Sequence, residues 1–153
     1  MVIRTRKSLG EILVGWGTLS ASDLKKAEDM AKSGGKKLSD ILVETGMAKE
    51  DQVAKGMAQQ FGMEFVDLSS REVTSKVYMK LIPDDLIKKF TILPMGKAGG
   101  KLQLIIHDPM DLELLDMLRF RLGTEVEPRL APKSAIKAFI EGGGGGGGGS
   151  AQP

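Results

Sequence analysis

A sequence motif near the start of the chain occurs twice, and this repeat limits the possible folds more than any other feature. A shift of 29 residues aligns LGEILVGWG, residues 9–17, with LSDILVETG, residues 38–46. Repeated supersecondary units of this kind cannot bury their apolar faces alone, so neighbouring copies pack on each other. We therefore expect one helical subdomain over residues 1–62, with Leu13 and Leu42 in equivalent core positions.

Each copy of the repeat predicts two helices joined by a tight corner. The apolar residues that open each copy are spaced i, i+3, i+4, which places them on one face of a helix. Gly17 stands where a left-handed residue ends a helix, and Ser20 with Asp23 resembles the capping box that begins the next one. The second helix of each copy is expected to stop at a glycine, Gly34 in the first copy and Gly62 in the second.

The second half of the chain shows shorter apolar runs separated by turn residues. Strands are predicted at residues 63–68, 90–97, 101–107 and 124–130, with a hairpin turn at residues 98–100. Helices are predicted at residues 75–89 with a break at Pro83, at about 111–122 with Leu112, Leu115 and Leu118 on one side, and from Pro132 onward. Because proline cannot donate to a sheet, Pro128 indicates that the last strand lies at an edge.

The order of these elements predicts an α+β fold with two subdomains. A tandem helical-pair repeat subdomain occupies residues 1–62, and a small mixed β/α subdomain occupies residues 63–141. Residues 142–149 are eight consecutive glycines. Polyglycine has no side chains whose packing offsets its conformational entropy, so residues 142–153 are predicted to form a flexible linker or tail.

The composition excludes several kinds of functional site. The chain has no cysteine and one histidine, His107, so disulfides and thiolate metal sites are excluded, and we expect no metal site. No serine or second acid is placed to partner His107, so we expect no catalytic residues. Residues 96–101, GKAGGK, lack the spacing and the hydroxyl of a phosphate-binding P-loop, and we interpret them as a hairpin turn. The sequence therefore predicts a protein that is not an enzyme and carries no cofactor.

The charge balance argues against a nucleic-acid partner. Lysine and arginine total 22 and aspartate and glutamate total 20, a net charge of +2, whereas nucleic-acid binders carry a concentrated basic face. The helix pairs invite comparison with helix-turn-helix DNA readers, but their lysines alternate with acidic residues as on a solvated face. No stretch reaches the length of a membrane span, and the first residues lack the apolar core of a signal peptide. We therefore expect a cytoplasmic protein without a direct membrane span.

The tandem repeat resembles part of a known protein family. The pattern Leu-Gly-x-x-Leu-x-x-x-Gly at residues 9–17, the capped helix after it and the close second copy resemble the N-terminal domain of type II secretion and type IV pilus assembly ATPases. QQFGMEFVDL at residues 59–68 and HDPMD at residues 107–111 resemble later landmarks of the family, so the resemblance covers about residues 8–141. It implies a regulatory or docking domain whose partners are proteins of a secretion or pilus machine. Through such a partner the domain would lie beside the inner membrane.

In some members of this family the tandem repeat binds cyclic di-GMP, and each copy opens as Arg-Leu-Gly and closes with Gln. Here the first copy opens as Ser8-Leu9-Gly10 and has Ala31 at its closing position, whereas the second opens as Lys37-Leu38-Ser39 and closes at Gln60. The ligand-binding residues that the resemblance implies are Ser8, Leu9, Gly10, Leu13, Lys37, Leu38, Asp40, Leu42, Gln60 and Asp108. Neither serine nor lysine reproduces the planar guanidinium that stacks on a base or forks onto phosphate, so we expect weak or no binding of cyclic di-GMP.

Two functions therefore remain open, a protein-docking domain and a cyclic di-GMP sensor. Asp108 likewise has two interpretations: it caps the helix that follows Pro109, or it approaches the edge of a guanine as the family resemblance implies. Trp16, the only tryptophan, either covers the corner of the first repeat or is exposed for a partner.

Overall fold

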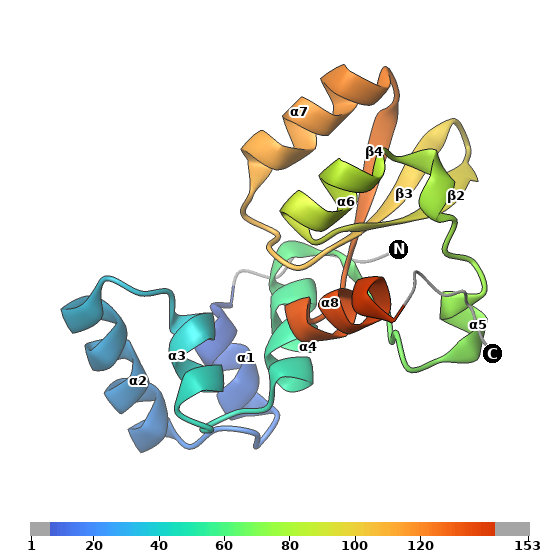
Figure 1. Ribbon diagram of the computed structural model, residues 1–153. Coiled ribbons are helices and arrows are strands. Elements are labelled where there is room, and N and C mark those ends of the chain that lie inside the picture. Colours follow the sequence, from blue (N-terminus) through green and yellow to red (C-terminus); the bar gives the residue numbers. More distant parts are fainter. Residues whose placement is uncertain (1–6, 143–153) are drawn as a thin grey trace. The chain divides into compact units, whose positions relative to one another are not determined.

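The computed structural model describes residues 7–142. The chain forms two compact units, which are divided between Met63 and Glu64 (Figure 1). The first unit is helical and the second contains a mixed four-stranded sheet with helices, so the predicted α+β fold is confirmed. Of the linker predicted at residues 142–153, all but Gly142 lies outside the described residues, and Gly142 ends the last helix.

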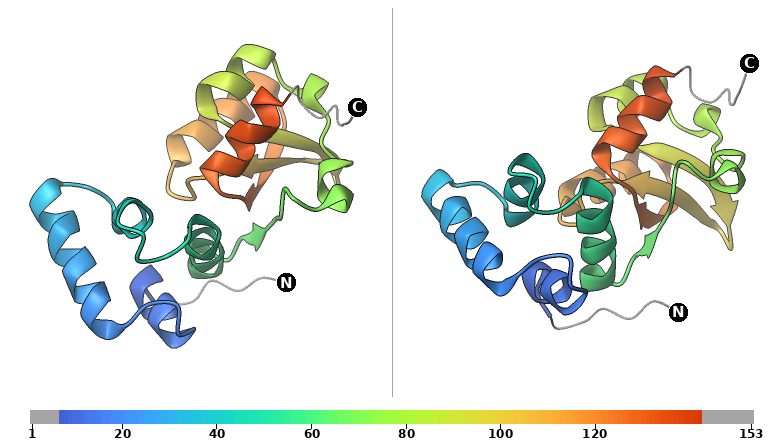
Figure 2. Two further views of the ribbon diagram at one scale, coloured as in Figure 1. Left: turned by 60° about the horizontal axis from the view of Figure 1, so that its bottom comes forward. Right: turned by 90° about the horizontal axis from the view of Figure 1, so that it is seen from below.

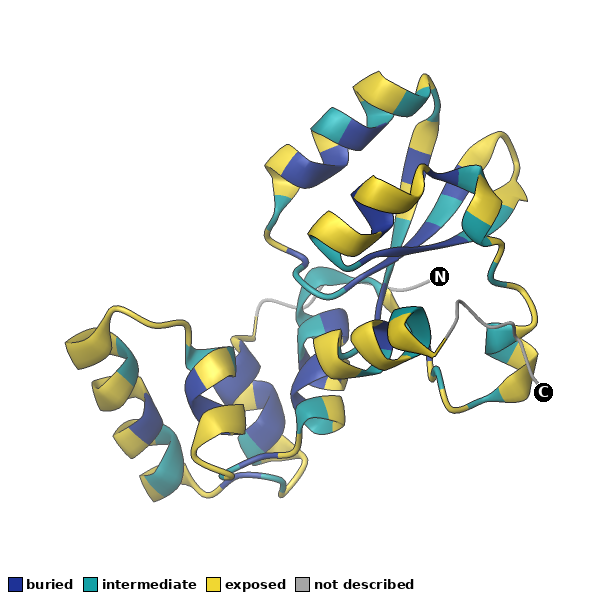
Figure 3. Cartoon of the chain, in the orientation of Figure 1, coloured by how far each residue is buried: buried dark blue, intermediate teal, exposed yellow. Residues whose placement is uncertain are grey.

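The described part of the first unit contains α1 (Leu9–Gly15), α2 (Ala21–Gly34), α3 (Leu38–Glu44) and α4 (Glu50–Phe61). α1 packs against α4, and α2 packs against α3, so each of these contacts joins a helix of one repeat copy to a helix of the other. The two contacts are equivalent, because each joins the first helix of one copy to the second helix of the other copy. Leu13 and Leu42 are both 0% exposed in one shared core, and the predicted packing of the two copies on each other is confirmed. Buried stretches are visible on α1, α3 and α4 (Figure 3).

The helix ends of the first unit follow from local sequence. Ser20 Oγ accepts the N–H of Asp23 at 3.1 Å and begins α2 as predicted. Gly17 follows α1 with φ of 77°, and Gly62 ends α4 with φ of 68°. Residues with a Cβ enter this left-handed region at a cost of about 1–2 kcal/mol, so glycine is favoured at both corners. Trp16 stands beside the first corner as the C-cap of α1, and 44% of the residue is exposed to solvent.

The second unit combines four strands with short helices. Its described elements are β1 (Glu64–Phe65), α5 (Arg71–Thr74), the 3-10 helix η1 (Met79–Leu81), α6 (Asp84–Phe90), β2 (Leu93–Ala98), β3 (Lys101–Ile106), α7 (Leu112–Leu122), β4 (Glu125–Leu130) and α8 (Lys133–Glu141). The strand order is β1-β4-β3-β2, in which only the β2–β3 pair is antiparallel. The sheet lies between α8 on one face and α6 and α7 on the other (Figure 1, Figure 2). Accordingly, Ile105 packs in one cluster with Ile136 of α8, while its neighbour Leu104 turns to the opposite face.

The helix predicted at residues 75–89 is wrong before Pro83. Before Pro83 the chain forms turns and η1, and the α-helical part of the predicted range is α6, which begins after Pro83. Ile82 has φ of −132° and ψ of 142°, because a residue that precedes proline is disfavoured in the helical conformation. Tyr78 is also extended, and its N–H donates to the carbonyl of Pro94 at 2.9 Å. Pairing with β2 therefore replaces a helical hydrogen bond.

The prediction that β4 lies at an edge because of Pro128 is also wrong, since β4 lies between β1 and β3. Ala131 donates its N–H to Ile106 of β3, and Leu130 accepts from Val66 on the β1 side. Backbone groups alternate along a strand, so the nitrogen of Pro128 faces the β1 side. The two-residue β1 is shorter than the strand predicted at residues 63–68 and pairs only with the end of β4. The missing N–H of the proline is tolerated because no strand lies opposite it.

Candidate functional site

The two openings of the repeat occupy equivalent positions, each at the N-cap of a helix. Ser8 precedes α1 and Lys37 precedes α3, and both have extended backbone. Ser8 Oγ accepts the N–H of Glu11 at 3.2 Å, and Glu11 Oε1 accepts the N–H of Ser8 at 3.0 Å. The bond from the Ser8 N–H is the main cause of a pKa of Glu11 below its ordinary value of 4.5. Ser8 thus stabilises its own helix at the position where the family resemblance places an arginine.

The start of α3 carries charges of both signs. Lys37 makes no side-chain cap to the helix and is exposed. The adjacent Lys36 pairs with Glu44 at 2.9 Å between Nζ and Oε1. Asp40 lies exposed in the first turn of the same helix. The charges at this opening therefore differ from those of Ser8 and Glu11, although the backbone positions are equivalent.

The apolar candidates lie mainly in the core of the first unit. Leu9, Leu13 and Leu42 are 7%, 0% and 0% exposed, and Leu38 is partly buried against the same cluster. Burial of a leucine side chain contributes about 1.5–3 kcal/mol to folding. These residues therefore stabilise the packed repeat whether or not a ligand binds, and of the four Leu38 keeps the most accessible side chain.

Gly10 and Gly56 allow helices of the first unit to approach closely. A Cβ at Gly10 would collide with the methyl groups of Leu24 on α2. A Cβ at Gly56 would stand 2.7 Å from Leu9 Cδ1 and 3.2 Å from Leu13 Cδ2, at the contact between α4 and α1. The family resemblance implied only a ligand-binding role for Gly10, and the sequence analysis missed this requirement of helix packing.

The closing positions of the two copies lie in the last turns of α2 and α4. Ala31 packs against the core cluster with its methyl group. Gln60 is partly buried, and its amide offers both a donor and an acceptor. Only the second copy therefore presents a side chain at this position that can hydrogen bond to a nucleotide.

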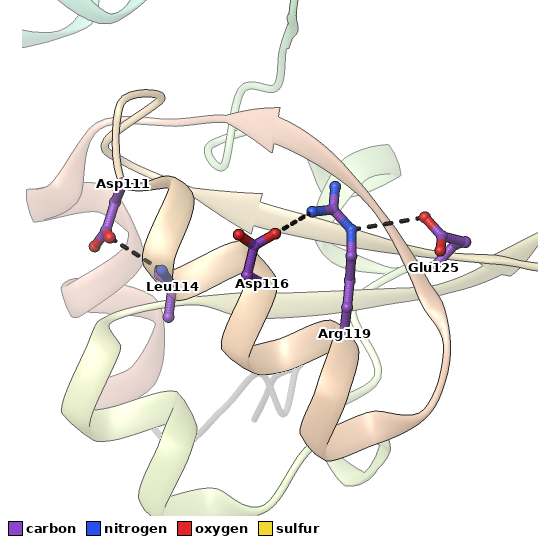
Figure 4. A network of polar contacts seen from close by, with 5 residues as sticks. All are labelled: Asp111, Leu114, Asp116, Arg119 and Glu125. Atoms are coloured by element: carbon purple, nitrogen blue, oxygen red, sulfur yellow. Dashed lines mark hydrogen bonds and ion pairs between the residues drawn. The ribbon is translucent and has the colours of Figure 1, made fainter.

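Asp108 belongs to the second unit, whereas the other nine candidates lie in the first. Its Oδ1 accepts the N–H of Met110 at 2.9 Å within the turn at Pro109. The residue that caps α7 is Asp111, whose Oδ1 accepts the N–H of Leu114 at 3.1 Å (Figure 4). The interpretation of Asp108 as the helix cap is therefore wrong, because the turn places Asp111 beside the first N–H groups of the helix.

The buried side of α7 differs from the side predicted from the sequence pattern. Leu115 and Leu118 are buried, but Leu112 is 65% exposed. Steps of three residues turn a stripe by about 60° around the helix, so Leu112 leaves the core and Leu114 enters it. Phe120, which the sequence interpretation did not consider, is 87% exposed. Leu112 and Phe120 lie about two helical turns apart and therefore on the same side of the helix, but the position between them is Asp116, so the sequence has no continuous second apolar stripe that would have revealed them.

Arg119 connects the exposed side of α7 to β4. Its Nη1 lies 3.0 Å from Asp116 Oδ1 on the same helix, and its Nε lies 3.6 Å from Glu125 Oε1 (Figure 4). The guanidinium is more enclosed than either carboxylate, at 36% exposure against 77% for Asp116 and 71% for Glu125. One cation thus holds two exposed carboxylates near the surface of α7.

Within residues 7–142, no group of three or more histidine, aspartate or glutamate side chains is placed to hold a metal ion. None of the helices in that range has both the length and the apolar character needed to cross a membrane. The glycine-rich segment at residues 96–101 joins β2 to β3, with Ala98 paired to Lys101, as the hairpin interpretation predicted.

Comparison with known proteins identifies the family. The MshEN domain matches residues 61–147 of the chain, which is more than half of its length. The chain belongs to the MshEN domain family. The matched residues contain the second unit, whereas the tandem repeat of this MshEN chain lies almost entirely before them.

Relatives extend the similarity over the repeat. The MshEN chain is 29% identical over 133 residues to the type IV pilus assembly ATPase PilB of Myxococcus xanthus, an alignment that covers 87% of this chain and 23% of PilB. The chain therefore spans about a quarter of the length of that relative. Its fold is similar to that of MshE solved with cdg, with a TM-score of 0.70 and 28% identity, and the match covers 89% of this chain and 98% of the solved MshE chain.

A second solved structure, the N-terminal domain of XpsE, has a TM-score of 0.67 and 25% identity, and the match covers 91% of this chain and 97% of that domain. The resemblance of the MshEN chain to the N-terminal domains of type II secretion and type IV pilus assembly ATPases is thus confirmed. The roles of the individual ligand-binding residues stay predictions.

Proposed function

We propose that this MshEN domain is a non-catalytic regulatory or docking domain of a type II secretion or type IV pilus-type assembly ATPase, and that it acts by binding another protein of the machine. The observation that carries the proposal is the match to nearly the whole of an isolated N-terminal domain, that of XpsE, together with a match to about a quarter of PilB. The chain thus corresponds to a part of the relatives that folds as a separate unit.

The described residues offer support for a non-catalytic role. The glycine-rich segment at residues 96–101 is a hairpin between two strands, whereas a P-loop joins a strand to the N-terminus of a helix, where the amides bind phosphate. We place the domain on the cytoplasmic side of the inner membrane, where it is held through its partner.

Direct binding tests the docking function. The purified chain is titrated by calorimetry with the purified cytoplasmic domains of the other components of a secretion or pilus machine, and phosphate release from ATP is measured in parallel. We expect saturable binding to one component and no ATP hydrolysis. If the chain binds none of the components to which the longer ATPase binds, the docking function is wrong, and ATP hydrolysis by the chain would refute the non-catalytic role.

A cyclic di-GMP sensor is the second candidate, and the similarity to MshE solved with cdg favours it. The residues that would contact the ligand are those that the family resemblance implies, which include the two openings at equivalent helix N-caps and Gln60 in the last turn of α4. Two missing arginine contacts, at about 1–3 kcal/mol each, weaken binding by roughly one to four orders of magnitude. We therefore propose that cyclic di-GMP binds weakly or not at all.

Restoring the family motif separates the two candidates. The four changes are Ser8→Arg, Ala31→Gln, Lys37→Arg and Ser39→Gly, and calorimetric titration with cyclic di-GMP compares this variant with the unchanged chain. Because Ser8→Arg removes the capping box of α1, a thermal melt must first show that the variant is folded. We expect at least about tenfold tighter binding by the variant. Sub-micromolar binding by the unchanged chain would instead favour the sensor, and no binding by the folded variant would remove its support.

A further inference from the structure

The chain passes from the first unit to the second over a very short connection. Gly62 ends α4 with φ of 68°, and the N–H of Met63 donates to the carbonyl of Ala58 at 2.8 Å, so Met63 is still tied to α4. The next residue, Glu64, begins β1, which pairs with β4. The backbone torsions that neither anchor fixes are those between the nitrogen of Met63 and Glu64.

The two ends of β1 are held to β4 in different ways. At its far end, the N–H of Val66 donates to the carbonyl of Leu130 at 2.9 Å, and the Val66 side chain is 4% exposed in the cluster that contains Ile136 of α8. At its start, Nη1 of Arg129 pairs with Oε1 of Glu64. The ladder between them has only two residue pairs. The start of β1 therefore depends on an ion pair, whereas its far end depends on a buried side chain.

Arg129 is the enclosed member of this ion pair. Its side chain is 16% exposed, against 58% for Glu64. Its Nε is buried and finds no hydrogen-bond acceptor within residues 7–142, and the carboxylate of Glu127 stands 3.8 Å from its Nη2. A guanidinium in such a position loses stability if a partner is removed, so the closed pair is favoured. Glu64 nevertheless remains accessible to water and to other cations.

We propose that the ion pair of Glu64 and Arg129 is a latch that sets the length of the hinge between the two units. While the pair is closed, the hinge is confined to the torsions around Met63. When it opens, Glu64 and Phe65 leave β4, and the hinge extends to the anchor at Val66. Two further residues add up to about 7 Å of reach, at about 3.3–3.6 Å each.

The latch gives the domain a means of regulation. A cation that competes for the exposed Glu64 loosens the connection between the helical unit and the sheet unit, without unfolding either of them. The inference goes beyond the proposed function, because it holds whether the first unit binds a protein or a nucleotide.

Distances between two spin labels test the latch in the whole chain. Because the chain has no cysteine, Glu28→Cys on α2 and Lys137→Cys on α8 provide two exposed labelling positions, one in each unit. Glu64→Gln then removes the charge of the carboxylate and keeps the size of the side chain. We expect this variant to broaden the distribution of label–label distances by up to about 7 Å. The backbone ¹⁵N order parameters of residues 63–65 should fall from about 0.85 to below about 0.6.

Glu127→Gln is the matched control, because it removes the other carboxylate near the same arginine, at 3.8 Å, and it should leave both measurements unchanged. In about 1 M salt, where the screening length is about 3 Å, the distances in the unchanged chain should broaden toward those of Glu64→Gln. The proposal is overturned if Glu64→Gln changes neither measurement, if Glu127→Gln changes them equally, if salt has no effect, or if residues 63–65 already have low order parameters in the unchanged chain. Loss of the native amide shifts of β2 and β3 in Glu64→Gln would also overturn it, because the pair would then be required for folding of the sheet unit.

Discussion

Replacing Leu13 with alanine tests how the two repeat copies pack. Leu13 is 0% exposed, and its Cδ2 stands 3.2 Å from where a Cβ of Gly56 would lie, at the contact of α1 with α4. The substitution removes three carbon atoms from this contact, and their transfer alone accounts for about 2.4 kcal/mol at roughly 0.8 kcal/mol each. A residual cavity adds to this cost, so we expect the free energy of unfolding of the first unit to fall by about 2.5–5 kcal/mol.

The fluorescence of Trp16 provides the assay, because the only tryptophan of the chain lies in the first unit at the C-cap of α1. Urea unfolding followed by this signal reports on the first unit, while circular dichroism reports on both units. With an m-value of about 1–1.5 kcal/mol/M for a unit of this size, the urea midpoint should fall by roughly 2 M or more. If the first unit is less stable than that loss, it should be unfolded in the absence of urea.

Two further variants make the result interpretable. Leu42→Ala is the equivalent change in the other repeat copy and should cause a similar loss, since Leu42 is also 0% exposed. Val43→Ala changes the next residue of α3, which is 37% exposed, and should cost only about 0.5 kcal/mol. A loss for Leu13→Ala below about 1 kcal/mol, or one no larger than that of Val43→Ala, would refute the shared core.

Three more outcomes follow from local structure. The Ser8 N–H lowers the pKa of Glu11 in the folded chain. The stabilisation of the fold by ionised Glu11 is therefore present above pH 4.5 and is lost as the pH falls through the lowered pKa. Glu11→Gln should remove this acid-dependent loss of stability, measured as urea midpoints at low pH. Gly62→Ala should destabilise the first unit by about 1 kcal/mol in the Trp16 assay, because φ of 68° is costly for alanine; an unchanged midpoint would contradict this. Thr91 has φ of 55°, so Thr91→Gly should raise the melting temperature of the second unit through a gain of about 0.5–1 kcal/mol, and a lower one would show that other contacts of Thr91 dominate.

The sequence was sufficient for features that depend on neighbouring residues. The repeat, the corner at Gly17, the cap at Ser20 and the hairpin at residues 98–100 were all predicted, because helix caps, turns and periodic apolar stripes are specified within a few residues. The family resemblance was also readable, since it depends on the same short patterns.

Tertiary structure decided the features that depend on distant parts of the chain. The sequence determined that the two repeat copies pack together, but the exchange that pairs α1 with α4 and α2 with α3 is a property of the packed unit. The helix predicted before Pro83 is lost because Tyr78 hydrogen bonds to Pro94 of β2, and Pro128 is tolerated inside the sheet because β1 is short. Phe120 is as apolar as a core residue, yet it does not lie on the buried side of α7 and is therefore exposed to solvent. A local pattern specifies which side chains share a face, whereas burial of that face depends on which surface of the fold packs against it.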